Sequence, residues 1–150
     1  FSTDATLFVG GTDRGWGARG GKPFALQRTR WKGKTPFEIQ TMKIRPDGFD
    51  LHFTQPLNVT IASDPSSYSM ETYTYIYQSA YGSPEVDQSS PVIQSATVSE
   101  DGTTVRLKID QLQVGHVHEL KLSEIITQSG ELLWNPVAYY TLNEIPKSVL

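Results

Sequence analysis

The sequence predicts an all-β fold, an antiparallel β-sandwich with an N-terminal Gly-rich β-hairpin extension. Apolar and polar residues alternate over short segments, as they do in strands that bury one face. Gly, Pro, Asn and Ser interrupt these segments at short intervals, which leaves no room for long helices. Most of the twelve glycines lie in the first 35 residues, which sets that part apart.

The sandwich strands are predicted from period-two alternation. Phe49, Leu51 and Phe53 alternate with Asp50 and His52, so the three apolar side chains face a core and the polar ones face water. The same pattern predicts strands at 105–109 and 118–122, with weaker candidates at 93–98 and 138–142.

Turn residues separate the predicted strands. Pro-Asp-Gly at 46–48 and Glu-Asp-Gly at 100–102 each precede an alternating segment and suit tight hairpin turns. Gln-Ser-Gly-Glu at 128–131 predicts a third turn. Short strands with this punctuation favour a sandwich over parallel β/α units, and we place it at residues 36–147.

Residues 1–35 are predicted to form a separate hairpin. A strand at 7–9, a long Gly-rich loop and a strand at 24–31 account for the segment. Two strands alone are marginally stable in water. We therefore expect this hairpin either to dock on the sandwich or to belong to a neighbouring domain.

Composition excludes several classes of protein. With 37% hydrophobic and 19% charged residues the chain is expected to be globular. A formal net charge of -3 gives no strong field, which disfavours nucleic acid and anionic membrane as partners. The chain has no cysteine, so it cannot form disulfides, thiolate metal sites or a covalent c-type haem attachment. Its apolar runs are short, and we expect neither a membrane span nor a signal peptide.

A glycine pattern in the first segment resembles a nucleotide-binding fingerprint. Residues 15–20, Gly-Trp-Gly-Ala-Arg-Gly, match G-x-G-x-x-G after a predicted strand. That site needs a helix beginning at the last glycine, whereas 24–27 is predicted to be a strand. The sequence therefore favours glycines that allow a turn and let Trp16 lie across a strand or pocket.

No catalytic or metal-binding set is evident. His116 and His118 are two residues apart and share a strand face, but no third metal ligand is near them in the sequence. No G-x-S-x-G is present, and the carboxylates are scattered among turns. We expect no catalytic residue, no metal and no cofactor in this chain, and hence no enzyme.

Aromatic residues are the strongest candidate binding feature. Tyr73, Tyr75 and Tyr77 are predicted to share one strand face, and Tyr81 lies in the loop that follows. Such a row can pack in a core or interdomain contact, which we favour, or can stack on sugar rings. Trp134 is a further candidate for stacking.

Two segments resemble a known group of proteins. They are LFVGGTDRGWG with RGGKPF, at 7–17 and 19–24, and YTY through YGSPEVD, at 73–87. They resemble the C-terminal end of large secreted bacterial redox proteins that join a sorbosone/glucose-dehydrogenase-like β-propeller to c-type cytochrome domains. More loosely, 99–120 resembles bacterial immunoglobulin-like domains, which implies an immunoglobulin-like sandwich.

This resemblance implies a setting and a parent protein. Residues 1–35 would be the propeller-closing segment, and the location would be extracellular or periplasmic. Haem c or a quinone would lie elsewhere in the parent protein. The parent would be associated with polysaccharide degradation. Arg14, Trp16 and Arg19 would be able to approach a propeller cofactor.

Two functions are expected on this basis. The first is a non-catalytic accessory module that packs against other domains of the same polypeptide. The alternative is a carbohydrate-binding module that holds the parent on polysaccharide through Trp16, Trp134 or the loop that contains Tyr81.

Overall fold

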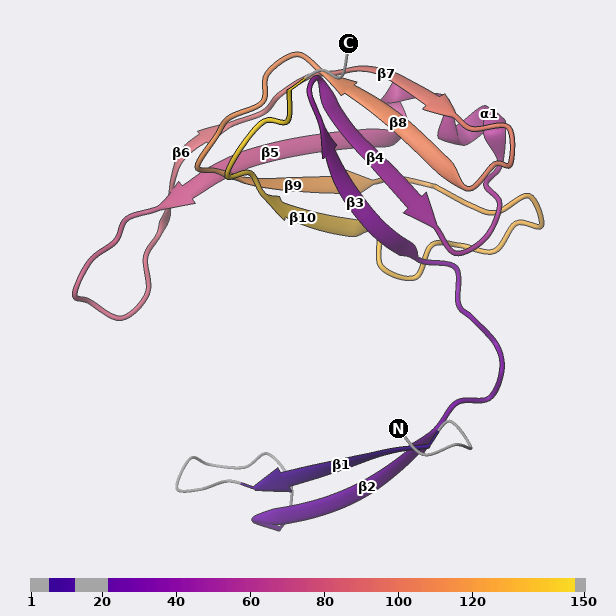
Figure 1. Ribbon diagram of the computed structural model, residues 1–150, viewed down its shortest axis with the longest axis vertical. Coiled ribbons are helices and arrows are strands. Elements are labelled where there is room, and N and C mark those ends of the chain that lie inside the picture. Colours follow the sequence, from indigo (N-terminus) through magenta and orange to yellow (C-terminus); the bar gives the residue numbers. More distant parts are fainter. Residues whose placement is uncertain (1–5, 13–21, 148–150) are drawn as a thin grey trace. The chain divides into compact units, whose positions relative to one another are not determined.

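The computed structural model describes residues 6–12 and 22–147 (Figure 1). The chain divides into two compact units, Phe1–Thr35 and Pro36–Leu150.

The first unit contains one two-stranded antiparallel sheet. β1 (Thr6–Thr12) pairs with β2 (Phe24–Arg30), and Phe8 lies directly opposite Arg28. The predicted hairpin therefore forms, with a longer first strand than the alternation indicated. All of β2 is exposed, and no other described strand pairs with this sheet.

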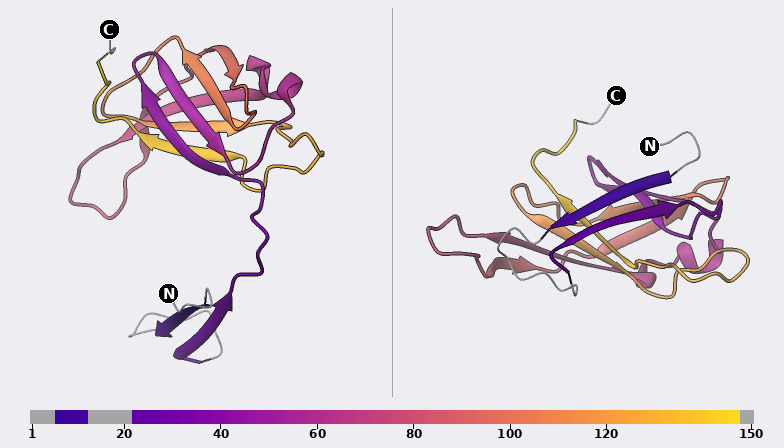
Figure 2. Two further views of the ribbon diagram at one scale, coloured as in Figure 1. Left: turned by 45° about the vertical axis from the view of Figure 1, so that its right-hand side comes forward. Right: turned by 90° about the horizontal axis from the view of Figure 1, so that it is seen from below.

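The second unit is a sandwich of two four-stranded antiparallel sheets (Figures 1 and 2). One sheet has the order β3-β4-β8-β7 and the other the order β10-β9-β5-β6. The strands of the first sheet are β3 (Ile39–Arg45), β4 (Gly48–Phe53), β8 (Thr104–Ile109) and β7 (Ile93–Val98). Those of the second are β10 (Val137–Thr141), β9 (Val117–Leu122), β5 (Tyr68–Tyr75) and β6 (Glu85–Ser89).

The predicted all-β antiparallel sandwich is confirmed. The strand order also matches A-B-E-D and G-F-C of the immunoglobulin sandwich, with β6 in the position of C′. Two strands were not anticipated, β3 and β6, because their residues alternate weakly and stay partly or fully exposed at the sheet edges.

The core lies between the two sheets. Phe49, Leu51 and Phe53 of β4 are each at most 3% exposed, as their alternation predicted. They pack with side chains from both sheets, among them Met70, Val105, Leu107, Leu120 and Leu122. Each such side chain stabilises the fold by roughly 1.5–3 kcal/mol relative to exposure, so the sandwich has a sufficient core of its own.

Short helical segments close one end of the sandwich. Asn58 caps α1 (Val59–Ala62), since its side-chain oxygen accepts a hydrogen bond from the N–H of Ile61. A single 3-10 turn, η1 (Pro65–Ser67), follows and leads into β5. Among the described residues no helix is long and apolar enough to span a membrane.

Candidate functional site

The tyrosine-bearing segment leaves the sheet earlier than predicted. β5 ends at Tyr75, and residues 76–84 form a loop that extends beyond the sheet before β6 begins (Figure 1). The prediction of one strand through Tyr77 is therefore wrong. Tyr77 and Tyr81 lie in this loop and are fully exposed, at 105% and 108%. We call residues 76–84 the tyrosine loop.

Two hydrogen bonds hold the neck of the tyrosine loop. The N–H of Ile76 donates to Oγ of Ser83 at 2.8 Å, and Nε2 of Gln78 donates to the carbonyl of Gly82 at 2.8 Å. Gly82 has φ +79°, a left-handed conformation that a glycine adopts without strain. The loop is therefore held by hydrogen bonds across it, and the rings of Tyr77 and Tyr81 project from it into solvent.

Tyr73 is a packing residue and does not join an exposed row. Its side chain is 5% exposed, and its hydroxyl donates to Oε2 of Glu119 at 3.1 Å. Burial raises the pKa of the Tyr73 hydroxyl, and the neighbouring Tyr75 and Glu119 raise it further. The rings of Tyr73 and Tyr75 meet edge to face, with centroids 5.6 Å apart and planes at 79°. The two rings are not coplanar, so they cannot form one flat stacking platform.

The structure places Trp134 far from the tyrosine loop along the sheet. The side chain is 73% exposed, and its backbone N–H donates to the carbonyl of Phe37 at 3.2 Å. Trp134 precedes the start of β10, which runs in the same direction as β5 because both are antiparallel to β9. The tyrosine loop follows the end of β5, so the two lie at opposite ends of the sheet. Arg14, Trp16 and Arg19 lie outside the described residues.

A polar cluster lies where β6 meets the segment before β9. Oδ2 of Asp87 is 2.9 Å from Nε2 of His116 and accepts a hydrogen bond from Nε2 of Gln113 at 3.3 Å. Asp87 has φ +53°, an uncommon conformation for a residue with a side chain. The hydroxyls of Thr72 and Ser89 are 2.7 Å apart, and Ser89 also contacts Gln113. These contacts join β6 to the loop before β9, and neither hydroxyl is hydrogen-bonded to a histidine among the described contacts.

His118 belongs to the core. It is 0% exposed, its ring meets that of Phe49 at 5.6 Å, and Nε2 accepts the N–H of Gln113 at 3.3 Å. Burial is the largest influence on the His118 pKa and lowers it. His116 instead contacts Asp87, so the two imidazoles have different partners. Among residues 6–12 and 22–147 no three His, Asp or Glu side chains are grouped closely enough to hold one metal ion.

The outer face of the β3-β4-β8-β7 sheet carries an ion-pair network that the sequence did not reveal. Asp50 accepts from Nε of Arg45 at 2.6 Å and from Nη1 of Arg106 at 3.1 Å. Arg106 also pairs with Asp47. Burial opposes ionisation of Asp50, but the hydrogen bonds and charges of both arginines outweigh it and hold its pKa below the usual value.

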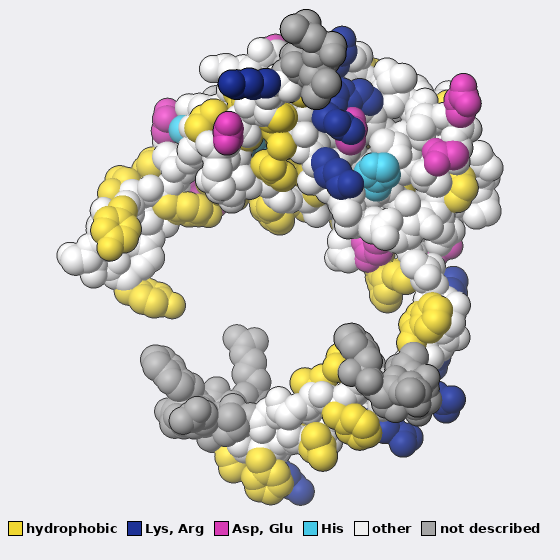
Figure 3. Space-filling view, viewed as in Figure 1, with side chains coloured by type: hydrophobic (Ala, Val, Ile, Leu, Met, Phe, Trp, Pro, Cys, Tyr) yellow, Lys and Arg dark blue, Asp and Glu magenta, His cyan; other side chains and the backbone are white. Residues whose placement is uncertain are grey.

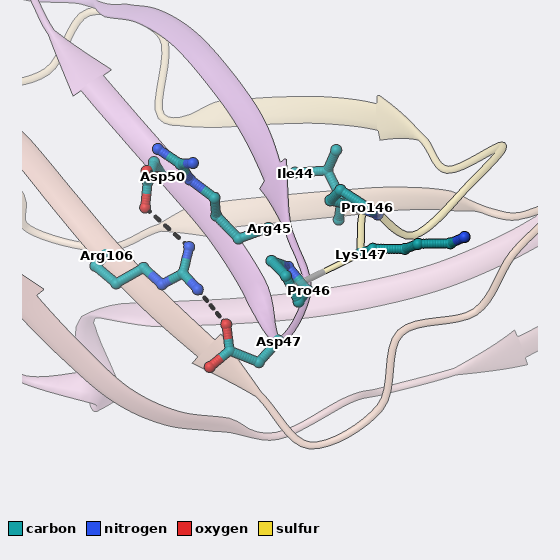
Figure 4. Close-up of a pocket in the computed structure, with 8 residues that line it drawn as sticks. All are labelled: Ile44, Arg45, Pro46, Asp47, Asp50, Arg106, Pro146 and Lys147. Carbon is teal, nitrogen blue, oxygen red and sulfur yellow. Dashed lines mark hydrogen bonds and ion pairs between the residues drawn. The ribbon is translucent and has the colours of Figure 1, made fainter. Parts of the chain in front are cut away.

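These side chains line a hollow of about 770 Å³ (Figure 4). Pro146 and Lys147 border it from the C-terminal segment. Because the two arginines pair with the two aspartates, the hollow presents largely neutralised charge. Strand alternation places Asp50 on the outer face, but only the register of β4 against β8 brings Arg106 opposite it.

No protein-family model and no curated protein matches the sequence. The fold is similar to the N-terminal part of the bacterial S-layer protein SbsC, with a TM-score of 0.55 and 18% identity over 73% of this chain and 24% of that chain.

Two longer SbsC structures are similar in the same way. Domains 1-6 match with a TM-score of 0.56 and 19% identity over 78% of this chain and 15% of that chain. The structure of rSbsC(31-844) matches with a TM-score of 0.55 and 20% identity over 76% and 15%. At these identities the likeness concerns the fold. The chain spans about a quarter or less of the length of the structures that it matches.

Proposed function

We propose that residues 36–147 are a non-catalytic structural module of a larger secreted or cell-surface protein. One observation carries this proposal: the sandwich has a complete core of its own, and its clustered polar side chains hydrogen-bond mainly to one another. A module of this kind positions neighbouring domains and contributes no chemistry. Because these polar side chains are engaged with one another, we propose that the module has no enzyme activity.

The similar structures support the same proposal. All three are structures of one bacterial surface-layer protein, SbsC, in which the matched fold covers only 15–24% of the chain. A cell-surface location and packing beside other domains suit a self-contained sandwich. A redox parent with haem c or a quinone is a separate proposal, which rests on the resemblance of segments 7–24 and 73–87 alone.

Deletion tests the structural role. Residues 36–147 are removed from the longer protein in its own host, and turnover per molecule and retention at the cell surface are measured. We expect turnover to be unchanged and retention or assembly to fall. A loss of turnover with intact folding of the remaining protein would contradict a non-catalytic role.

A second candidate function, carbohydrate binding, is favoured by the exposure of Tyr77 and Tyr81. Uncharged, fully exposed rings on a shaped loop can stack on sugar faces. Affinity gels containing cellulose, xylan or chitin test it, with Tyr77→Ala/Tyr81→Ala as the variant. Unchanged migration of the wild-type chain in all three gels would eliminate this function.

A further inference from the structure

The small net charge hides a strong separation of charge between the two units. Residues 1–35 hold seven basic and two acidic side chains, a formal charge of +5. Residues 36–150 hold six basic and fourteen acidic side chains, a formal charge of -8. The net charge of the whole chain is too small to indicate a charged partner, as expected. The charges of the two units taken separately are large enough to do so.

One face of the hairpin combines apolar and cationic side chains. The register places Phe8, Phe24 and Leu26 on this face, at 59%, 69% and 77% exposure, together with Arg28 and Arg30. Figure 3 shows hydrophobic and basic side chains gathered over this unit. The described part of the hairpin unit contains no acidic residue. A two-stranded sheet with this much exposed apolar area is unstable without a cover.

The outer face of the β10-β9-β5-β6 sheet has the complementary character. Glu71 and Glu119 lie directly opposite each other on β5 and β9. They share one cation, because Nζ of Lys121 is 3.1 Å from Glu71 and 3.3 Å from Glu119. Tyr75 and Tyr139 are 52% and 61% exposed. Two like charges in direct cross-strand opposition are unfavourable, and one lysine between them leaves a net negative charge. Glu71 is the more accessible carboxylate, at 57% exposure against 16% for Glu119, which also accepts a hydrogen bond from Tyr73.

We propose that the hairpin of one copy of this chain docks on the outer face of the β10-β9-β5-β6 sheet of a second copy. The apolar half of the hairpin covers the exposed tyrosines, and Arg28 and Arg30 meet Glu71 and Glu119. Side chains two apart on a strand are separated by about 6.6 Å. Those directly opposite in an antiparallel pair are separated by about 5 Å. The two spacings differ by about 1.6 Å, which the flexible arginine side chains can span.

Charge complementarity identifies a hairpin of this same sequence as the occupant of the sheet face. Both complementary surfaces belong to the same chain, so two copies can exchange hairpins reciprocally and form the same contact twice under two-fold symmetry. The second contact forms within the complex and gains from a high effective concentration. This inference is independent of the proposed function, because a structural module can be monomeric or self-associating.

Sedimentation of the full 150-residue chain tests the inference. We expect a concentration-dependent dimer at low salt that dissociates as salt rises, because exposed charges are screened within about 10 Å at 0.1 M salt. Arg28→Glu/Arg30→Glu should weaken the dimer by about a hundredfold, which corresponds to ~2.7 kcal/mol. Glu71→Arg/Glu119→Arg should weaken it similarly, and a mixture of the two variants should restore it in part.

A control variant separates specific pairing from net charge. Lys43→Glu/Lys147→Glu makes the same change in charge at exposed positions away from both surfaces and should leave the dimer intact. Three results would overturn the inference: a monomer at every concentration and salt, an association that Arg28→Glu/Arg30→Glu does not weaken, or equal weakening by the control. Docking of the hairpin on its own sandwich would give the first result.

Discussion

Gly48 at the start of β4 lies directly against Leu107 of β8. A Cβ atom at Gly48 would overlap the carbonyl oxygen of Leu107 and stand 3.2 Å from the Cα of Lys108. Its φ is +153°, within the range that L side chains rarely adopt. The Pro-Asp-Gly turn predicted from the sequence thus requires its glycine for close approach between two core strands, in addition to the turn itself.

Gly48→Ala should destabilise the sandwich by more than about 2 kcal/mol, because β8 backbone would have to move. Gly115→Ala is the matched control: its φ is +83°, but nothing lies within 4 Å of its added Cβ. We expect that variant to lose only about 1 kcal/mol. Urea unfolding of both variants measures the difference, and equal losses would contradict the role of Leu107.

Asp50→Asn should destabilise the protein by about 1–3 kcal/mol, because two charge-assisted hydrogen bonds from Arg45 and Arg106 are weakened. The Asp50 pKa lies below 3.8 in the folded protein, so below pH 3.8 the unfolded chain takes up a proton that the folded protein does not. Stability from this carboxylate is therefore lost as the pH falls through its folded-state pKa.

The acid dependence of Asp50 is measured by thermal unfolding below pH 5, with Glu144→Gln as an exposed control. We expect Asp50→Asn to flatten the wild-type decline and the control to leave it unchanged. A decline of the same steepness in Asp50→Asn would show that other groups produce it.

His118 should make the protein less stable under mildly acidic conditions. Burial lowers its folded-state pKa below 6.5, so as the pH falls past 6.5 the unfolded chain binds a proton first. The contribution of neutral His118 to folding stability is fully present above pH 6.5 and is lost as the pH falls. His118→Gln keeps an acceptor for the N–H of Gln113 and should reduce the loss between neutral pH and pH 5. Chemical unfolding at several pH values compares the two proteins.

The tyrosines should divide into one that stabilises the fold and two that do not. Tyr73→Ala should cost roughly 3 kcal/mol, since it removes a buried ring. Tyr73→Phe should cost about 1 kcal/mol through loss of the hydrogen bond to Glu119. Tyr77→Ala and Tyr81→Ala should stay within about 0.5 kcal/mol, because both rings are fully exposed. A large loss from either loop substitution would show that the loop packs against something in solution.

Strands that bury one face were predictable from the sequence, whereas two of the edge strands, β3 and β6, were not. Phe49, Leu51 and Phe53 alternate cleanly because the pleat sends every second side chain to the core. β3 and β6 bury little, so no pattern of hydrophobicity marks them. Tyr77 was misplaced for a related reason, because period-two spacing of tyrosines continues past the residue where pairing stops.

The candidate site was predictable only as a set of residue types. Tyr81 in an exposed loop follows from turn residues around it, and the structure agrees. The burial of Tyr73 against Glu119 depends on a partner 46 residues away. Asp50 and Arg106 are 56 residues apart and meet only through the register of two strands. Separations of this length leave no local signal.

The sequence by itself determined the all-β class, the three glycine-containing turns and the inward faces of β4, β8 and β9, because these depend on local backbone geometry and on the two-residue period of a strand. It also determined the charge of each unit. Tertiary structure alone decided which tyrosines are buried, which carboxylates meet arginines, and that Glu71 opposes Glu119. Those relationships depend on strand order and register, which arise only when segments distant in the chain pack around a common core.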